Sequence, residues 1–117
     1  MQTETKASVD QITDGNGGRV NVLRFSGDIS SSSHDALLGT YETVSKAEPV
    51  LLDFSKVDYI NSSGIALVIQ LLIEASNSGQ KVYAFGLSAH FVKVFTMVGI
   101  TKYAGLYPGQ AEALAAL

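Results

Sequence analysis

The sequence predicts a single α/β domain, a sandwich with four to five strands and about four helices. Short apolar segments alternate along the chain with longer segments in which apolar residues recur every three or four positions, as strands alternate with helices. Hydrophobic residues make up 46% of the 117 residues and charged residues 16%, so the chain has enough apolar surface for a folded core. We therefore expect residues 1–117 to form one domain.

The first two strands are expected to form a β-hairpin. Residues 8–13 have the short alternating pattern of an edge strand, and residues 19–25 alternate again. Between them, residues 14–18 have the sequence Asp-Gly-Asn-Gly-Gly, which is typical of a turn because Gly and Asn adopt positive φ easily. A phosphate-binding loop is not expected here, since a helix would have to follow it and residues 19–22 have a strand pattern.

A polar corner and a helix come next. Residues 27–33 carry Gly, Asp and a run of serines, and Ser32 or Ser33 is placed to cap a helix that continues to about residue 47. Apolar residues at three- and four-residue spacing give this helix one face that packs on the sheet. Pro49 ends it, because the residue before a proline leaves the helical region.

The chain is organised around residues 50–79. The apolar run of residues 50–54 predicts a buried strand, and residues 65–73 predict a helix that is apolar on most sides. Between these two elements lie Asn61, Ser62 and Ser63, whose side-chain oxygens are placed to accept hydrogen bonds from the first amides of the helix. Free amides and the helix dipole at this end also favour a bound or attached phosphate.

The rest of the chain completes the sheet. Gly79 is suited to end the central helix, and residues 81–85 predict a strand, which makes residues 50–85 a β-α-β unit with a right-handed crossover. The last three expected elements are a helix, a short strand and a terminal helix, over residues 89–98, 103–106 and 110–117.

Composition and charge exclude several classes of function. The net charge is −3 and the eight basic residues are spread along the chain, so no basic face for nucleic acid is expected. No window reaches the roughly 18 consecutive apolar residues that a membrane span needs. Residues 1–11 lack the basic and apolar pattern of a signal peptide, so we expect a cytoplasmic protein without membrane insertion.

No enzyme activity, metal site or cofactor is expected. The chain has no cysteine, and His34 and His90 lie at expected helix starts without a paired acid. A receiver domain needs an acidic pair where only Asp28 stands, and a haloacid-dehalogenase-like phosphatase needs a second Asp where Ser55 stands. A serine hydrolase needs a Gly-x-Ser-x-Gly elbow, which the sequence does not contain.

A pattern across residues 53–67 combines an Asp-Phe-Ser strand end, a Tyr-Ile pair, an Asn-Ser-Ser-Gly helix start and an apolar helix. This pattern resembles the STAS domain family, and most closely its bacterial anti-sigma factor antagonists of the SpoIIAA and RsbV type. Residues 25–29, Phe-Ser-Gly-Asp-Ile, are similar to a second corner of that family. The resemblance implies a STAS-like sandwich, in which helices surround a mixed, mostly parallel sheet. One position departs from the family pattern, because Asn61 stands where Asp is most common.

The resemblance implies a regulatory switch. Ser62 matches the serine that is phosphorylated in the antagonists, while Ser63 is the second candidate and is expected to cap the helix. The implied partner is an anti-sigma factor with GHKL-type serine kinase activity, which binds the unphosphorylated domain and releases it after phosphorylation of Ser62. A phosphatase is the further implied partner, and no cofactor is implied because the kinase supplies ATP and magnesium. Five residues are expected at the switch and the partner contact: Asp28, Asp53, Asn61, Ser63 and Gly64. The two aspartates among them are expected to form hydrogen bonds near the serines.

Two other functions fit the same resemblance. One is a scaffold subunit of a stressosome-like assembly, and the other is an accessory module of a transporter that binds a lipid or another small molecule. Some of Val68, Leu72, Phe91 and Met97 are expected to form an exposed partner surface or to cover such a ligand.

Overall fold

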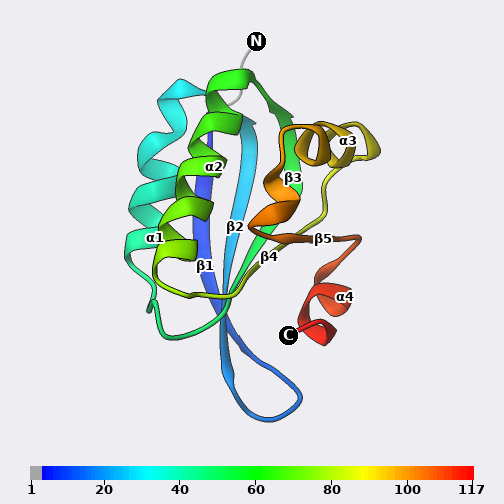
Figure 1. The fold of residues 1–117 in the computed structure, drawn as a ribbon. Coiled ribbons are helices and arrows are strands. Elements are labelled where there is room, and N and C mark those ends of the chain that lie inside the picture. The colour runs from blue at the N-terminus through cyan, green and yellow to red at the C-terminus, as the bar shows by residue number, and fades with distance from the viewer. Residues whose placement is uncertain (1–3) are drawn as a thin grey trace.

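The computed structural model describes residues 4–117 and builds them around one five-stranded sheet in the order β1-β2-β3-β4-β5 (Figure 1). β1 pairs with β2 in antiparallel orientation and every other pair is parallel, which confirms the predicted mixed, mostly parallel sheet. Residues 1–3, which belong to the amino-terminal segment considered above, lie outside the described residues. The strands are β1 (Lys6–Thr13), β2 (Arg19–Ile29), β3 (Val50–Ile60), β4 (Val82–Phe85) and β5 (Gly105–Tyr107).

Helical segments connect the parallel strands. The α-helices are α1 (Thr40–Glu42), α2 (Ser62–Asn77), α3 (Ala89–Met97) and α4 (Gln110–Ala115). Short helical turns of other types are η1 (Ser31–Ser33), the π-helical η2 (Asp35–Gly39) and η3 (Ile100–Lys102). Among residues 4–117, no helix is both long and apolar enough to cross a membrane.

The helix predicted over residues 33–47 is shorter and less regular than expected. It consists of η1, η2 and α1, and the α-helical part ends at Glu42. Just beyond that end, the hydroxyl of Thr43 donates to the Thr40 carbonyl at 2.7 Å, and the hydroxyl of Ser45 accepts from the Ala47 amide at 3.1 Å. Such local side-chain bonds compete with the helical pattern, so the segment ends earlier than its apolar spacing predicts.

Two strands are longer than predicted. Residues 27–29 were expected to form a corner and β3 was expected to end near residue 54, but β2 and β3 pair as far as Ile29 and Ile60. The pairing shifts twice, between Arg24 and Ser26 and between Gly27 and Asp28. Gly27 has a φ of 83°, which glycine adopts without steric cost, so the strand continues through the second irregularity.

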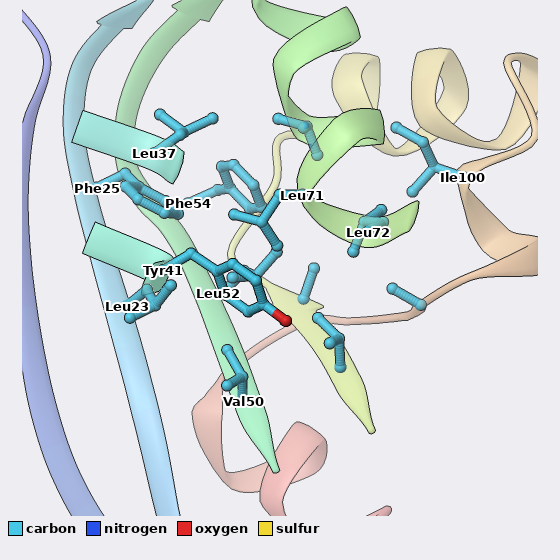
Figure 2. Packing of buried hydrophobic residues seen from close by; sticks show 14 of the residues in the cluster. Leu23, Phe25, Leu37, Tyr41, Val50, Leu52, Phe54, Leu71, Leu72 and Ile100 are labelled. Atoms are coloured by element: carbon cyan, nitrogen blue, oxygen red, sulfur yellow. The ribbon is translucent and has the colours of Figure 1, made fainter. Parts of the chain in front are cut away.

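The main core lies between one face of the sheet and the helices α1, α2 and α3. Phe54 of β3 packs against Phe25 of β2, with ring centroids 5.6 Å apart, and edge-on against Phe95 of α3, with centroids 5.7 Å apart. Figure 2 shows Leu71 and Leu72 of α2 closing over these strand residues. Burial of side chains of this size stabilises the fold by about 1.5–3 kcal/mol each.

The apolar residues proposed above as an exposed partner surface are mostly core residues. Val68, Leu72 and Phe91 are buried in the main cluster, so the prediction that they form a surface is wrong for these three. Met97, at the end of α3, is 78% exposed. The helix α2 is apolar on several sides because both the sheet and the segment formed by η1 and η2 contact it.

A second, smaller core lies on the opposite face of the sheet. Val22, Leu51 and Phe85 from three strands pack there with Ala113 of α4. The short helix α4 covers only part of this face (Figure 1). Beside the cluster the face becomes polar, beginning with Arg24 and Asp53.

Candidate functional site

The amino-terminal end of α2 is capped by Asn61. Its backbone is extended, with φ of −86° and ψ of 178°, and its side-chain oxygen accepts a hydrogen bond from the Gly64 amide at 2.8 Å. The Asn61 amide donates to the carbonyl of Ile29 at 3.1 Å, which ties the helix start to the end of β2. The prediction that Ser63 caps this helix is therefore wrong. Asn61, which directly precedes the first turn, has the extended backbone that a cap requires, whereas Ser63 is already inside the helix.

Both serines of the first turn are exposed. Ser62 and Ser63 are the first two residues of α2, and within residues 4–117 neither hydroxyl nor either backbone amide forms a hydrogen bond. Asn61 satisfies the third amide of the turn, so the other amides point to solvent at the positive end of a 16-residue helix. This arrangement presents hydroxyls to solvent in a place where an attached phosphate is electrostatically favoured.

Gly64 allows α2 to approach the sheet closely. A Cβ atom at this position would lie 2.7 Å from the carbonyl carbon of Ile29 and closer still to its oxygen. A residue with a Cβ atom would collide with the backbone of β2 at that distance, so α2 can start this close to the sheet only with glycine at position 64. The role of Gly64 is thus to set the position of the two serines relative to β2 and β3.

Asp28 and Tyr59 lie at the same end of the sheet. They are opposite each other in the pairing of β2 with β3, one residue before Ile29 and two residues before Asn61. Tyr59 is 56% exposed and its ring contacts Phe91, with centroids 6.0 Å apart. Asp28 therefore stands near the helix start, and Tyr59 adds an aromatic surface beside the serines.

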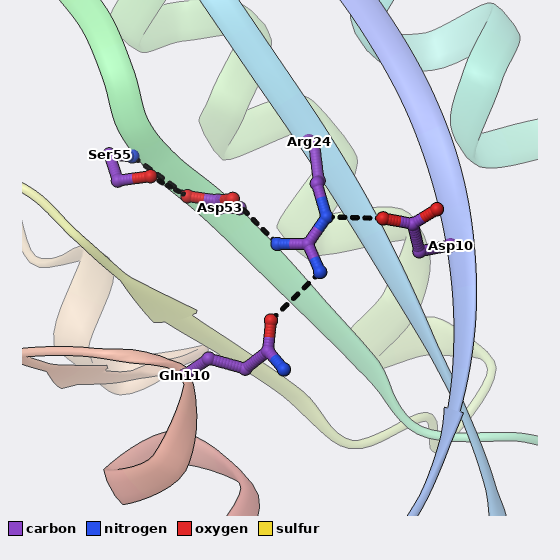
Figure 3. Close-up of polar contacts among 5 residues, drawn as sticks. All are labelled: Asp10, Arg24, Asp53, Ser55 and Gln110. Atoms are coloured by element: carbon purple, nitrogen blue, oxygen red, sulfur yellow. Dashed lines mark hydrogen bonds and ion pairs between the residues drawn. The ribbon is translucent and has the colours of Figure 1, made fainter.

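Asp53 does not belong to this site. It lies on the opposite face of the sheet and is only 6% exposed. Figure 3 shows the Arg24 guanidinium between two carboxylates: Nη1 donates to Asp53 at 2.8 Å and Nε donates to Asp10. The other oxygen of Asp53 accepts from the amide and the hydroxyl of Ser55, at 2.8 and 2.6 Å. The prediction that Asp53 forms hydrogen bonds near the serines is wrong, because successive residues of a strand point to opposite faces.

The polar cluster around Arg24 was not predicted from the sequence. Its members come from four elements, since Nη2 of Arg24 also donates to Gln110 of α4 at 2.9 Å. The pKa of Arg24 is raised, chiefly by its hydrogen bond to Asp10 and also by its interactions with Asp53, whereas burial acts to lower it. The alternation of side chains along β2 could have indicated that Arg24 lies on the same face of the sheet as Val22. The pairing of Arg24 with Asp53, however, depends on the register between β2 and β3.

The other polar residues considered above are separate from the helix start. His34 and His90 are exposed, and Nδ1 of His34 lies 3.2 Å from the carboxylate of the neighbouring Asp35. Within the part of the chain that the structure describes, no group of three His, Cys, Asp or Glu side chains is arranged to hold a metal ion. The candidate site is accordingly the set Asp28, Tyr59, Asn61, Ser62, Ser63 and Gly64.

Comparison with known proteins identifies the fold. The family model described as "Mlab, STAS domain" matches residues 12–108. An anti-sigma factor antagonist from Mycobacterium paratuberculosis is similar with a TM-score of 0.75 and 18% identity, over 99% of this chain and 97% of that one. The phosphorylated form of the Bacillus cell fate determinant SpoIIAA gives 0.68 and 18%, over 94% and 97%.

Similar domains also occur inside larger proteins. The murine anion transporter Slc26a9 is similar with a TM-score of 0.74 and 11% identity, over 98% of this chain but only 22% of the transporter chain. No curated protein matches the sequence significantly. At such low identities these likenesses establish the fold and not the partners.

Proposed function

Because this chain belongs to the STAS domain family, with the fold of the SpoIIAA-like anti-sigma factor antagonists, we propose that it is itself such an antagonist and works as a phosphorylation switch. Unphosphorylated, it binds an anti-sigma factor that is also a GHKL-type serine kinase. Phosphorylation of Ser62 releases it, and a phosphatase restores the binding form. The domain is not an enzyme in this scheme and regulates sigma-factor-dependent transcription through its partner.

The observation that carries the proposal is the exposed Ser62 hydroxyl, which has no structural task at the start of α2. Asn61 performs the capping, with its side chain 2.8 Å from the Gly64 amide. Ser62 can therefore be modified without removing a hydrogen bond on which the helix depends. Ser63 is also exposed, and the resemblance to the antagonists favours the first serine of the pair.

The mechanism follows from charge. A phosphoserine adds about −1.5 to −2 charges at pH 7. At the first turn of α2 this charge is stabilised by roughly 0.3–1 kcal/mol, so the domain stays folded. A partner that covers Tyr59, which is 56% exposed beside the serines, would have to desolvate the new charge. Release then results from the changed surface and not from unfolding.

A second function has one specific observation in its favour. An apolar cavity of about 420 Å³ lies between the start of α3 and the segment that joins β5 to α4, and Leu87, Val92 and Leu106 are among its lining residues. A small apolar ligand would fit a cavity of this size, as an accessory module of a transporter would require. Native mass spectrometry of the purified protein would detect such a ligand, and gel filtration would detect a stressosome-like assembly.

The phosphorylation proposal is tested with the cognate anti-sigma factor and ATP. Mass spectrometry of the peptide that spans residues 57–70 should show one phosphate on Ser62 in the natural sequence and in Ser63→Ala, and none in Ser62→Ala. Circular dichroism of each variant is the control for folding. Phosphate on Ser63 would move the switch by one residue. The absence of phosphate with any GHKL-type partner would refute the switch.

A further inference from the structure

We propose that the polar half of the sheet face opposite α2 is a binding site for a small organic phosphate. A cavity of about 470 Å³ is open there, beside the Arg24 cluster and on the other side of the sheet from Ser62. Cavities of this size hold small molecules in many proteins. The proposal is independent of the phosphorylation switch, because the two sites share no residue.

The cations of this site come from a single row across three strands. Lys6 of β1 is paired with Ser26 of β2, and Ser26 is paired with Lys56 of β3. All three line the cavity, so a lysine stands on each side of a central serine. Neither lysine forms an ion pair with the described residues, and the Ser26 hydroxyl forms no hydrogen bond with them. Two free ammonium groups and a free hydroxyl match the charge and the acceptor oxygens of a phosphate.

A β-bulge brings Lys56 to this face. Between Arg24 and Ser26, β2 advances by two residues while its partner β3 advances by three, from Asp53 to Lys56. Without the extra residue, strict alternation would put Lys56 on the face opposite Asp53. With it, Asp53, Ser55 and Lys56 all line the same cavity. Bulges redirect side chains in this way next to functional sites.

The floor of the cavity carries a hydrogen-bonded charge cluster in which one guanidinium faces two carboxylates, so the cluster has a net charge of −1. Arg24 is held by Asp53 at 2.8 Å and by Asp10, and Asp53 is held in turn by Ser55. The cluster links the strands that carry the two lysines. Lys6 and Lys56 add two positive charges to it, so the site as a whole has a net charge of +1.

The placement of the lysines is not explained by solubility alone. A lysine on an edge strand such as β1 discourages pairing with other chains, which accounts for Lys6 by itself. Lys56 lies on β3 beyond Asp53, where β3 pairs with β2 but not with β4, so the two lysines flank Ser26 from separate strands. The chain has a net charge of −3 and only eight basic residues, yet Lys6, Arg24 and Lys56 line this one cavity. Cavity volume beyond that of the phosphate itself leaves room for an organic group.

The test uses inorganic pyrophosphate and glycerol 3-phosphate as probes, with glycerol as the uncharged control, in low-salt buffer because screening weakens exposed charges. Titration followed by NMR should shift the amide signals of Ser26 and Lys56. Lys6→Gln and Lys56→Gln should each raise the Kd about tenfold, and Lys102→Gln, an exposed lysine on η3, should leave it unchanged.

Three outcomes would overturn the proposal. One is no titration with either probe, and another is an equal loss of affinity in Lys102→Gln and Lys56→Gln, which would indicate unspecific attraction. The third is binding to phosphatidylserine vesicles without binding to either free phosphate, which would make the face a membrane contact. Thermal melts of each variant show whether it is folded, so a loss of binding is not confused with unfolding.

Discussion

Gly64→Ala should destabilise the protein although alanine is the better helix former. The new Cβ would lie 2.7 Å from the carbonyl carbon of Ile29, far inside the roughly 3.5–4.0 Å at which carbon atoms pack best. The backbone of Ile29 is held by its pairing with Ile60 of β3, so the start of α2 must move away by about 1 Å. That movement also lengthens the 3.1 Å hydrogen bond from the Asn61 amide to Ile29. Overpacking costs about 1–3 kcal/mol, and the higher helix propensity of alanine offsets about 1 kcal/mol.

Because the contact is with backbone, we place the steric cost of Gly64→Ala at or above the upper end of that range. The expected net loss is about 2 kcal/mol, equivalent to a fall of roughly 6–10 °C in Tm. Urea denaturation measures it, and Gly39→Ala is the matched control. Gly39 has a helical φ of −63° and the nearest atom to an added Cβ would be 4.0 Å away. The control should gain about 0.4–1 kcal/mol. If both variants change stability in the same direction, the contact with Ile29 does not position α2.

The remaining predictions concern the cap, the Arg24 cluster and pH. In urea denaturation, Asn61→Ala should lower the free energy of unfolding by about 1 kcal/mol, while Asn61→Asp should leave it unchanged because Asn and Asp both cap well. Equal losses in the two variants would show that the cap bond is not stabilising. Asp53→Ala should cost about 1–3 kcal/mol because it removes a nearly buried carboxylate that accepts hydrogen bonds from Arg24 and Ser55. Asp10→Ala, at an exposed position, should cost less than about 1 kcal/mol, and the reverse order would contradict the assignment. Burial raises the pKa of Tyr41 above 10.0, so its contribution to stability is complete below pH 10.0 and decreases as the pH rises through the folded-state pKa. Unfolding measured from pH 9 to 12 should show this loss, and Tyr41→Phe should reduce it.

Much of the fold could be predicted because the signals are local. The turn at residues 14–18, the apolar run at residues 50–54 and the glycine that ends α2 each specify their own element. The lengths of β2 and β3 could not be predicted, since residues 27–29 are strand only because residues 57–60 pair with them. The irregular helix after β2 was missed because apolar spacing outweighed the hydroxyls of Thr43 and Ser45.

The candidate site was predicted in part. The sequence located the helix start and its polar residues, but a cap depends on backbone dihedral angles, and these selected Asn61 instead of Ser63. Alternation along β3 is enough to separate Asp53 from the serines, because Phe54 points to the main core. The contact of Gly64 with β2 joins residues far apart in the chain and has no local signal.

The central claim is that phosphate on Ser62 changes the surface of the domain and not its fold. Isothermal titration calorimetry of the cognate anti-sigma factor tests it directly, with the unphosphorylated protein, the Ser62-phosphorylated protein and Ser62→Ala. We expect Ser62→Ala to bind like the unphosphorylated protein and phosphorylation to weaken binding about a hundredfold, or about 2.7 kcal/mol, while the Tm of the phosphorylated protein changes by less than about 3 °C. Equal affinity of both forms, or a phosphorylated form that is unfolded, would contradict the account.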